Sequence, residues 1–445
     1  MNAQIDVAEQ AGFAVTRAVG GIPTAFQAEK GSGGPVLAFL GEYDALDGLS
    51  QESGATTQTP DIGSDAADGH GCGHHLLGAG SLLAAVALAR CLDELGIPGR
   101  VRYYGCPAEE AAAGKSFMVA AGAFEDVDAA LTWHPAGGHG TVSTQGRCLA
   151  YAQAHFRFSG TASHAGVSPH LGRSALDAAE MMNIGVNFLR EHMRDTARVH
   201  YAFIDAGGRS PNVVPASAEL YYLVRAETVA EMQELYNRVV AIAEGAARMT
   251  ETALDNTFDG ASAEILPNRV LEEALHQTLC EVGGVPFDDA DQLRAAKFSA
   301  LFADADVRNA RVGAGFDPND TRFLDDGVPD LAAPEHRHLN SGSSDVGDVS
   351  WTTPTVQILS CAVAFGTPWH TWQYVAQGKL PAAHKAMTHA ATVIASTGLD
   401  LFTDEELLAS ARAEHTVTLA ETPYVCPIPP GVVAPPVRRE RRSSP

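Results

Sequence analysis

The sequence is poor in basic residues. Its 445 residues contain 30 Lys and Arg against 54 Asp and Glu, which gives a formal net charge of -24 at pH 7. A surplus of negative charge repels phosphate backbones and anionic lipid headgroups. We therefore expect neither a nucleic acid nor a membrane among the partners of this protein.

Cysteines are few, and long apolar runs are missing. Seven cysteines are scattered along the chain without the dense framework of a disulfide-rich fold, which favours a reducing compartment. No uninterrupted apolar run reaches ~18 residues, and acidic residues such as Asp6 and Glu9 stand where a secretory signal needs an apolar block. These features predict a cytoplasmic protein.

The chain does contain a regular alternation of short apolar strands and longer helical runs. Runs typical of buried strands occur at 35–40, 100–105 and 129–133, and the Ala- and Leu-rich run 76–95 indicates a helix. Such an alternation is typical of a mostly parallel sheet with helices on both faces. The hydrophobic share of 45% is sufficient for a core of this kind.

After about residue 147 the order of the predicted elements changes. Two helical runs separate β-rich runs in the order βαββαβ, which is the plan of a small two-layer sandwich. The strands are expected at 149–160, 199–208, 217–226 and 252–258, and the helices at 174–193 and 229–249.

The change of pattern predicts two domains, as the chain length also does. We expect a discontinuous α/β domain over 1–148 and 267–445, with the βαββαβ domain inserted over 149–266. The segment 304–340 is rich in Asp, Pro, Gly and Asn and predicts a loop. The Pro- and Arg-rich tail after about 433 predicts disorder.

The densest chemical signal is the sequence DGHGCGHH at 68–75, directly before the predicted 76–95 helix. Imidazole nitrogens and thiolates bind zinc and related ions, and the intervening glycines let neighbouring side chains face one ion. A polar loop at the start of a helix is the alternative interpretation. Three His and one Cys within six residues favour a metal site.

Further candidate ligands follow predicted strands. Glu109 and Glu110 come after one strand, His134 ends the next, and His370 follows a third at 355–364. Carboxyl ends of parallel strands meet at one edge of the sheet, where such folds place their sites. Two adjacent acids alone also fit the first turn of a helix. The prediction of a site therefore rests on several candidate ligands that all follow predicted parallel strands. One carboxylate would bind a cation and the other would act as a base.

Other catalytic motifs are incomplete. The sequence AGKS at 113–116 imitates the end of a phosphate-binding loop, but Glu109 occupies the place of the loop's first glycine. Neither a G-x-S-x-G elbow nor an H-E-x-x-H helix is present. The glycine-rich run 69–73 lacks the third glycine of a dinucleotide fingerprint.

Taken as a set, the motifs resemble the dinuclear metal aminoacylase/carboxypeptidase family, and within it the p-aminobenzoyl-glutamate hydrolase-like amidohydrolases. The motifs are GEYDAL (41–46), GHGCGHH (69–75), PAEE (107–110), WHP (133–135), SGTASHAG (159–166), NVVPASA (212–218) and the distal His370. The resemblance implies an α/β catalytic domain that holds two divalent ions, zinc or manganese. It also implies that the inserted domain is a lid through which the chain forms a homodimer.

The resemblance further implies roles for individual residues. The metal ligands would be Cys72, His74, Glu110, His134 and His370, with Glu109 as general base and Asp44 as a supporting carboxylate. In the lid, His164 would reach across the dimer to stabilise the developing oxyanion, and Asn212 and Arg225 would contact substrate. Two features depart from the pattern: His70 and His75, either of which could take a ligand or supporting role, and a start close to the first strand, without the usual preceding helix.

We therefore expect a metal-dependent amidohydrolase that cleaves the amide bond of an N-acyl or N-aroyl amino acid with a metal-activated water. One alternative is an aminohydrolase that displaces an amino group from a small aromatic substrate. Another is a metal-binding scaffold or partner subunit with little activity alone. The expected base Glu109 argues against the scaffold, because a purely structural ion needs no such base.

Overall fold

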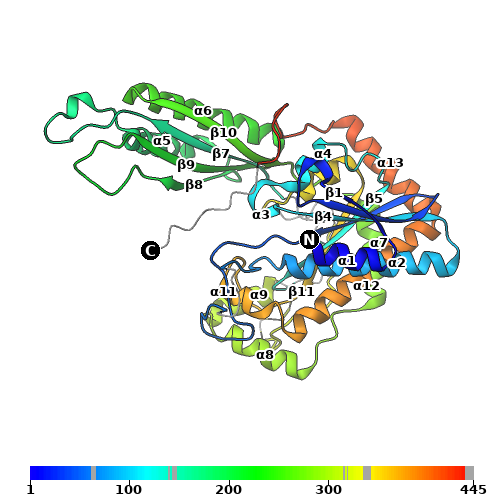
Figure 1. Cartoon of the computed structure of the whole chain (residues 1–445). Helices are drawn as coiled ribbons and strands as arrows, with labels where there is room; N and C mark the ends of the chain where they lie inside the picture. The colour runs from blue at the N-terminus through cyan, green and yellow to red at the C-terminus, as the bar shows by residue number, and fades with distance from the viewer. Residues whose placement is uncertain are drawn as a thin grey trace.

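The computed structural model describes residues 1–61, 67–138, 141–142, 148–313, 316–317, 319–333 and 342–435. Within these residues the chain forms one seven-stranded and one four-stranded sheet (Figure 1). The end of the predicted tail, from 436 on, lies outside the described residues, as does 334–340 of the predicted loop.

The larger sheet is parallel at its centre and antiparallel at its edges. Its strand order is β1-β2-β4-β3-β5-β11-β6, and the neighbours from β4 to β11 run parallel. The strands are β1 (Ala14–Arg17), β2 (Phe26–Ser32), β3 (Val36–Glu42), β4 (Gly99–Cys106), β5 (Ala129–Ala136), β6 (Thr141–Val142) and β11 (Thr355–Cys361). The mostly parallel sheet is confirmed, whereas β1, β2 and β6 were not predicted.

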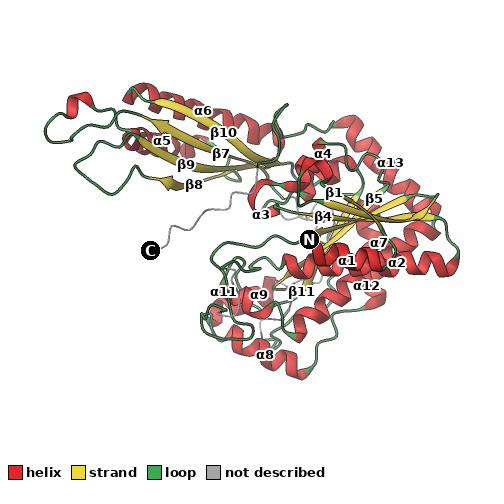
Figure 2. Ribbon diagram, in the orientation of Figure 1, coloured by secondary structure: helices red, strands yellow, loops and turns green. Residues whose placement is uncertain are grey.

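Helices cover both faces of this sheet (Figure 2). Alternate residues of β3 belong to different cores: Val36 and Ala38 pack in the cluster that includes α4, and Leu37 and Phe39 in the cluster that includes α2 and α12. This alternation follows from the two-residue period of a strand. The helices are α1 (Asn2–Gln10), α2 (His74–Leu95), α3 (Glu109–Ala112), α4 (Gly114–Ala120), α7 (Arg269–Val282), α8 (Asp289–Ser299), α9 (Asp304–Gly313), α10 (Val346–Thr352), α11 (Trp372–Gln377), α12 (Pro381–Thr403) and α13 (Glu405–Glu421).

Helix α2 is the one described helix whose length and composition would suffice to cross a membrane. Here it packs on β3 and α12, and Leu77, Ala85 and Leu88 are buried in the core. Its apolar character is therefore explained by its central place under the sheet.

Two expectations about the large domain are wrong. The N-terminal helix α1 precedes the first strand, because Ile5 and Ala8 form an apolar face that packs into the same cluster as α2. Residues 304–313, expected as loop, form α9, whose buried Val307 anchors an otherwise polar helix. In both segments a few buried apolar side chains outweigh a polar composition.

The smaller sheet has the predicted order βαββαβ. It consists of β7 (Ala150–Ser159), α5 (Ala175–Leu189), β8 (Arg198–Asp205), β9 (Ser217–Ala226), α6 (Val229–Thr250) and β10 (Ala253–Ser262). The strands run antiparallel in the order β10-β7-β9-β8, and α5 and α6 pack together on one face. Figure 1 shows this unit as an arm that extends from the larger sheet.

Candidate metal centre

The candidate ligands meet at the carboxyl edge of the four central parallel strands. Glu42 ends β3, the segment after β3 leads to Cys72 and His74, and His134 lies near the end of β5. Glu110 lies in α3, which follows β4, and His370 follows β11. The next two strands along the chain, β4 and β5, flank β3 on opposite sides, so the strand order reverses at β3. An open α/β sheet binds ligands at such a switch point.

Cys72 belongs to two groups of potential ligand atoms. One group contains Cys72, His74 and His134, the other contains Cys72, Glu110 and His370, and the atoms of each group lie within 4.8 Å of one another. Sγ of Cys72 is 3.6 Å from Nε2 of His134, and Oε1 of Glu110 is 3.1 Å from Nε2 of His370. The five ligands expected from the sequence thus lie together, and Cys72 lies between the two groups.

The donor atoms fit divalent metal ions. Nε2 of His74 and Oε1 of Glu110 are buried without a hydrogen bond among the described residues, and each faces an ion-pair partner, Glu42 or His370, at 3.1 Å. A shared cation would satisfy buried polar atoms that face one another in this way. Burial raises the pKa of the Cys72 thiol, so its thiolate needs a bound cation. Burial and the neighbouring His74 lower the pKa of His134 to about 4, which keeps this imidazole in the neutral, metal-binding form.

Asp44 orients two of these ligands. Its Oδ1 is 2.8 Å from Nδ1 of His74, and its Oδ2 accepts the Glu110 backbone N–H at 2.9 Å. Burial acts to raise the pKa of Asp44, but these hydrogen bonds hold it below its usual value. An ionised Asp44 fixes Nδ1 of His74 as a donor, so Nε2 is the ring atom that would bind a metal.

His70 and His75 lie beside the metal loop, each against a backbone carbonyl. Nδ1 of His70 is 3.0 Å from the carbonyl oxygen of Asp44, and Nε2 of His75 is 2.9 Å from that of Gly378. Their rings lie 4.7 Å apart. The geometry favours a supporting role for both, and neither belongs to the metal-ligand groups of the described residues.

Glu109 groups with Glu42 and His74 rather than with Cys72. Burial and the nearby carboxylates of Glu42 and Asp345 raise the pKa of Glu109 well above its usual value. A raised pKa is the direction of change that general acid–base catalysis by a carboxyl requires. Glu109 and Glu110, although adjacent, therefore lie in different surroundings.

The backbone around these ligands is held in an unusual conformation. Ala108 and Ala113, on either side of α3, have left-handed φ values of 60° and 59°, and His370 has φ 59°. The His370 N–H donates to the Gly71 carbonyl at 3.0 Å, which ties this residue to the metal loop. Residues other than glycine rarely adopt this backbone conformation, and such strain concentrates at functional sites.

The three lid residues lie at two different places. Arg225 lies on β9 opposite Tyr151 of β7, and its Nε is buried without a hydrogen-bond partner among the described residues. Burial lowers the pKa of Arg225, while Tyr151 and Glu109 act in the opposite direction, which indicates that Arg225 lies within electrostatic reach of Glu109. His164 and Asn212 lie at the far end of the arm, where the Ala165 N–H donates to the Asn212 carbonyl at 2.9 Å.

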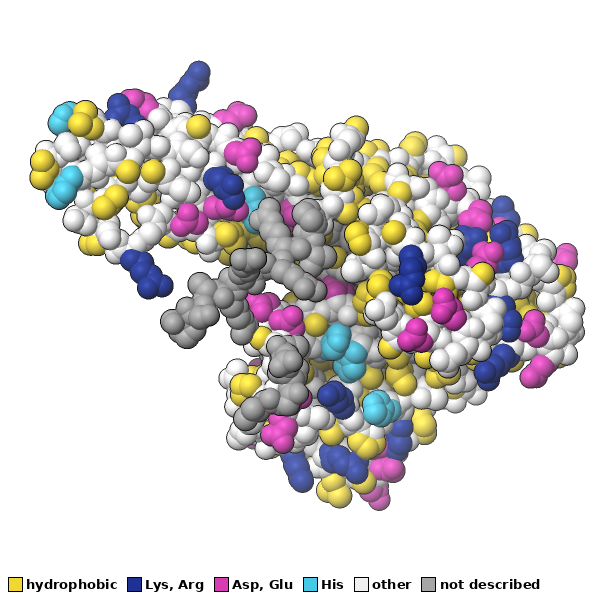
Figure 3. Space-filling model, in the orientation of Figure 1, with side chains coloured by type: hydrophobic (Ala, Val, Ile, Leu, Met, Phe, Trp, Pro, Cys, Tyr) yellow, Lys and Arg dark blue, Asp and Glu magenta, His cyan; other side chains and the backbone are white. Residues whose placement is uncertain are grey.

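Glu42 is the site residue that the sequence analysis missed. It is 1% exposed, and its Oε2 lies 3.1 Å from Nε2 of His74. A signal was present, because Glu42 is a carboxylate at the end of an apolar strand within the quoted GEYDAL motif. Figure 3 shows histidine and acidic side chains where the surface is hollowed below the arm.

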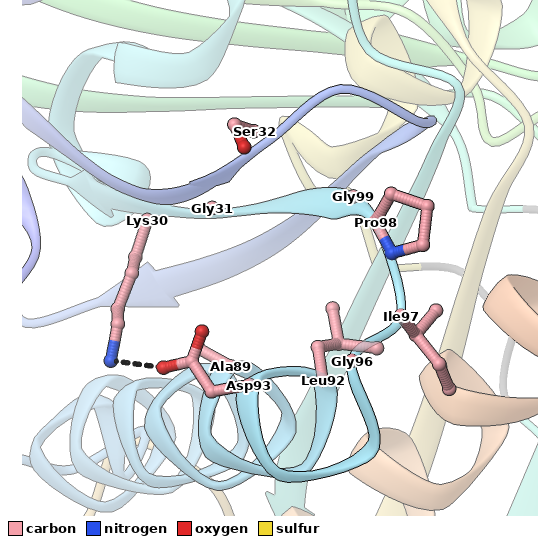
Figure 4. A pocket seen from close by; sticks show the side chains of 10 residues that line it. All are labelled: Lys30, Gly31, Ser32, Ala89, Leu92, Asp93, Gly96, Ile97, Pro98 and Gly99. Carbon is pink, nitrogen blue, oxygen red and sulfur yellow. Dashed lines mark ion pairs between the residues drawn. The ribbon is translucent and has the colours of Figure 1, made fainter.

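Another hollow lies at the opposite edge of the large sheet. It is lined by Lys30 and Asp93, whose ion pair is 2.9 Å long, and by the turn 96–99 (Figure 4). Ser32 at its rim pairs with Gly99, where β4 begins. Its lining residues include neither histidine nor cysteine, so the metal cluster remains the candidate site.

Comparison with known proteins identifies the family to which the chain belongs. The family model of the M20 peptidase dimerisation domain matches residues 150–251. Over 440 residues the chain is 47% identical to one subunit of the p-aminobenzoyl-glutamate hydrolase of Escherichia coli (strain K12), covering 97% of this chain and 90% of that protein. The other matched subunit of this hydrolase, from the same organism, is 32% identical over 268 residues, covering 58% of this chain and 59% of that protein.

A solved structure from Bacillus subtilis, described as a dinuclear metal binding peptidase from the M20 family, shares the fold. Its TM-score is 0.52 at 16% identity, covering 89% of this chain and 90% of that chain. The relative that matches nearly the whole chain and the matched dimerisation domain show the family as well as the fold. The chain belongs to the M20 family of metal-dependent hydrolases that act on amide bonds.

Proposed function

We propose that this metal-dependent amidohydrolase cleaves the amide bond of an N-acyl or N-aroyl amino acid, with p-aminobenzoyl-glutamate as the model substrate. The observation that carries the proposal is the pair of ligand groups around Cys72, next to the buried carboxyl of Glu109. The substrate class is supported by the relative that is 47% identical and named for hydrolysis of p-aminobenzoyl-glutamate.

The ligand set is proposed to hold two ions, with Cys72 shared between them, His74 and His134 on one and Glu110 and His370 on the other. A thiolate with imidazoles suits zinc, and the carboxylate and imidazoles also suit manganese. When bound, such ions polarise the amide carbonyl and activate a water.

Glu109 is proposed to take the proton of the attacking water and to return it to the leaving nitrogen. Its carboxyl lies beside His74 and Glu42 and belongs to neither of the two groups that contain Cys72. Arg225, whose Nε is buried without a hydrogen-bond partner among the described residues, is proposed to bind the carboxylate of the amino-acid product. A guanidinium donates in a planar fork that matches a carboxylate.

His164 is proposed to act on the site of a second copy of the chain. Gln153 and Tyr221 of the arm contact the Ala111 carbonyl next to Glu110, whereas His164 follows the opposite end of β7. From Gln153 to Ser159 the strand runs about 20 Å, at ~3.3 Å per residue. His164, with Asn212 beside it, is therefore remote from its own metal centre.

We propose a homodimer formed through the arm. The outer edge of β8 pairs with no other described strand, and Tyr201, Phe203 and Ile204 on it are exposed, as are Ile184 and Phe188 of α5. Exposed apolar side chains beside a free strand edge are typical of an interface. The matched dimerisation domain supports this proposal.

A second candidate is a hetero-oligomer in which this chain has little activity alone. It is favoured by the names of two relatives, which are different subunits of one hydrolase. The catalytic constellation of this chain weighs against an inactive role, because Glu109 would then have no function.

The test is product analysis with purified, metal-stripped protein that is reloaded with Zn²⁺ or Mn²⁺. We expect glutamate and p-aminobenzoate from p-aminobenzoyl-glutamate, detected by mass spectrometry, only after reloading. Release of ammonia would instead identify an aminohydrolase. Activity that appears only when a second, different polypeptide is added would identify the hetero-oligomer.

A further inference from the structure

Lys115 of the AGKS sequence is a fully buried cation beneath the metal centre. It lies in the first turn of α4 and is 0% exposed. Its Nζ is 2.6 Å from Oε1 of Glu42 and forms a second ion pair with Asp345. A buried ammonium is costly unless it is paired. Because Lys115 has no contact with solvent, we expect its role to lie in the two carboxylates that it pairs with.

Glu42 connects this ammonium to His74. While Oε1 of Glu42 accepts from Lys115, its Oε2 lies 3.1 Å from Nε2 of His74, and neither of these two facing atoms has a hydrogen-bond partner among the described residues. Nδ1 of His74 faces Asp44, so Nε2 of His74 is the atom directed at Oε2 of Glu42. In the metal-free protein these two atoms form an ion pair when His74 is protonated, and a bound cation would take the place of that proton. Ligand atoms that share an ion at about 2.0–2.2 Å from each lie roughly 3 to 3.5 Å apart, so Glu42 and His74 have the spacing of neighbouring ligands.

We propose that Lys115 is a positioning residue that holds Glu42 in the metal centre, where Glu42 adds an anionic oxygen next to His74. The proposal rests on the proposed metal site and is independent of the substrate. Asp345 anchors Lys115 in turn, because its carboxylate pairs with the ammonium and accepts the Lys115 backbone N–H at 2.8 Å. The three residues thus fix one carboxylate orientation in the site.

Two possible effects of Lys115 predict opposite changes in metal affinity when its ammonium is removed: charge repulsion of the metal, and positioning of Glu42. An ammonium repels a nearby divalent ion, so its removal alone would tighten metal binding. If Lys115 acts by holding Glu42, its removal weakens binding, because the carboxylate loses the donor that fixes it. Groups that orient metal ligands are typically worth ~10- to 100-fold in metal affinity.

The experiment measures the Zn²⁺ affinity of metal-stripped protein by competition with a chelating dye. We expect Lys115→Met and Glu42→Gln each to weaken Zn²⁺ binding by about 10-fold or more. The double variant should bind no more weakly than Glu42→Gln, since Lys115 acts through Glu42. Unchanged or tighter binding by Lys115→Met, or additive losses in the double variant, would overturn the proposal.

A charge-balanced pair of variants guards against a folding defect. Lys115→Met leaves the buried carboxylates of Glu42 and Asp345 without a counter-ion, whereas Lys115→Met with Asp345→Asn removes one charge of each sign. Asp345→Asn alone is the matched comparison: it keeps the Lys115–Glu42 pair, and the amide oxygen of Asn can still accept the Lys115 backbone N–H, so it should weaken Zn²⁺ binding less than Lys115→Met does. Near-ultraviolet circular dichroism and thermal melting of the metal-free proteins report folding.

The outcomes separate this proposal from the function. An unmodified chain that binds no Zn²⁺ would refute the metal centre itself. If that chain and the Asp345→Asn control bind Zn²⁺ and the charge-balanced double variant binds equally well, only the positioning role of Lys115 is refuted.

Discussion

At the scale of single residues, two adjacent carboxylates have different surroundings. Glu110 lies with Cys72 and His370, whereas Glu109 lies with Glu42 and His74. The Glu110 backbone N–H is held by Asp44, which fixes the start of α3 and thereby both side chains. The sequence PAEE shows two acids but does not distinguish them.

Replacing Glu109 by Gln should keep the metal and nearly abolish turnover. Gln preserves the size of the side chain and removes only the proton acceptor, and general-base catalysis is typically worth ~10² to 10⁴ in rate. Steady-state kinetics with elemental analysis of the same preparation measure both quantities. Turnover within a few-fold of the unmodified enzyme would refute the role of Glu109.

Glu110→Gln is the matched comparison, with the same chemical change one residue further on. We expect lower metal retention during dialysis, because a neutral amide replaces a charged ligand. If Glu109→Gln and Glu110→Gln retained metal equally well, the two roles would be wrongly assigned.

Replacing Cys72 by Ala should reduce the occupancy of both ions. Cys72 belongs to both ligand groups, whereas His370 belongs to one, so His370→Ala should leave one ion in place. Metal stoichiometry by elemental analysis at a fixed free-metal concentration distinguishes the two variants. A Cys72→Ala protein with full stoichiometry would remove Cys72 from the ligand set.

At the scale of elements, α5 and β8 expose apolar side chains that the fold of one chain leaves uncovered. Phe188 of α5 is 71% exposed, and β8 is the last strand of its sheet. The same two elements are well packed on their inner sides, where Val186 and Val199 are buried. The pattern indicates that α5 and β8 each have two apolar faces, one buried in the arm and one exposed, as expected for a protein–protein interface.

Phe188→Glu should therefore weaken the proposed dimer. A charged side chain in an apolar interface has to be desolvated without a partner, and the monomer should appear at higher protein concentrations than for the unmodified chain. Sedimentation velocity over a dilution series measures this shift. Leu95→Glu, at a residue of α2 that is 61% exposed, is the control and should leave the dissociation unchanged.

At the scale of the whole molecule, the far end of the arm carries His164 and the larger sheet carries Glu109. If each site combines Glu109 of one chain with His164 of the other, two inactive proteins should restore activity when mixed. A heterodimer of His164→Ala and Glu109→Gln chains has one site in which both groups are intact. We expect a measurable fraction of full activity, limited by the statistical share of heterodimers.

The mixing experiment needs proof that the chains exchange between dimers. Light scattering should show that both variants remain dimers, and mass spectrometry of differently labelled chains should show mixed dimers. With exchange demonstrated, a failure to regain activity would confine His164 to a structural role in the SHAG turn.

Much of the fold could be predicted because its elements follow local patterns. β9 occupies the predicted residues 217–226, and α2 begins two residues before the predicted helix 76–95. The strands β1 and β2 at one side of the sheet were missed, since partly exposed strands have weak periodicity. Helix α9 was missed because its stability comes from packing of Val307 rather than from composition.

The sequence alone determined which residues are the candidates for the chemistry. The motifs GHGCGHH, PAEE and WHP and the distal His370 pointed to a metal centre, and the family resemblance selected from them the five predicted ligands, which lie together in the structure. Local spacing suffices for this, because parallel strands necessarily bring their carboxyl ends to one edge.

Only the tertiary structure decided how these residues are supported. Lys115 and Asp345 are 230 positions apart, and Glu42 precedes Lys115 by 73, so no local pattern joins them. Their pairing depends on α4 and α10, which pack on each other and share one core cluster with β3. A buried ion pair is set by the three-dimensional exclusion of water, which short-range spacing in a sequence does not specify.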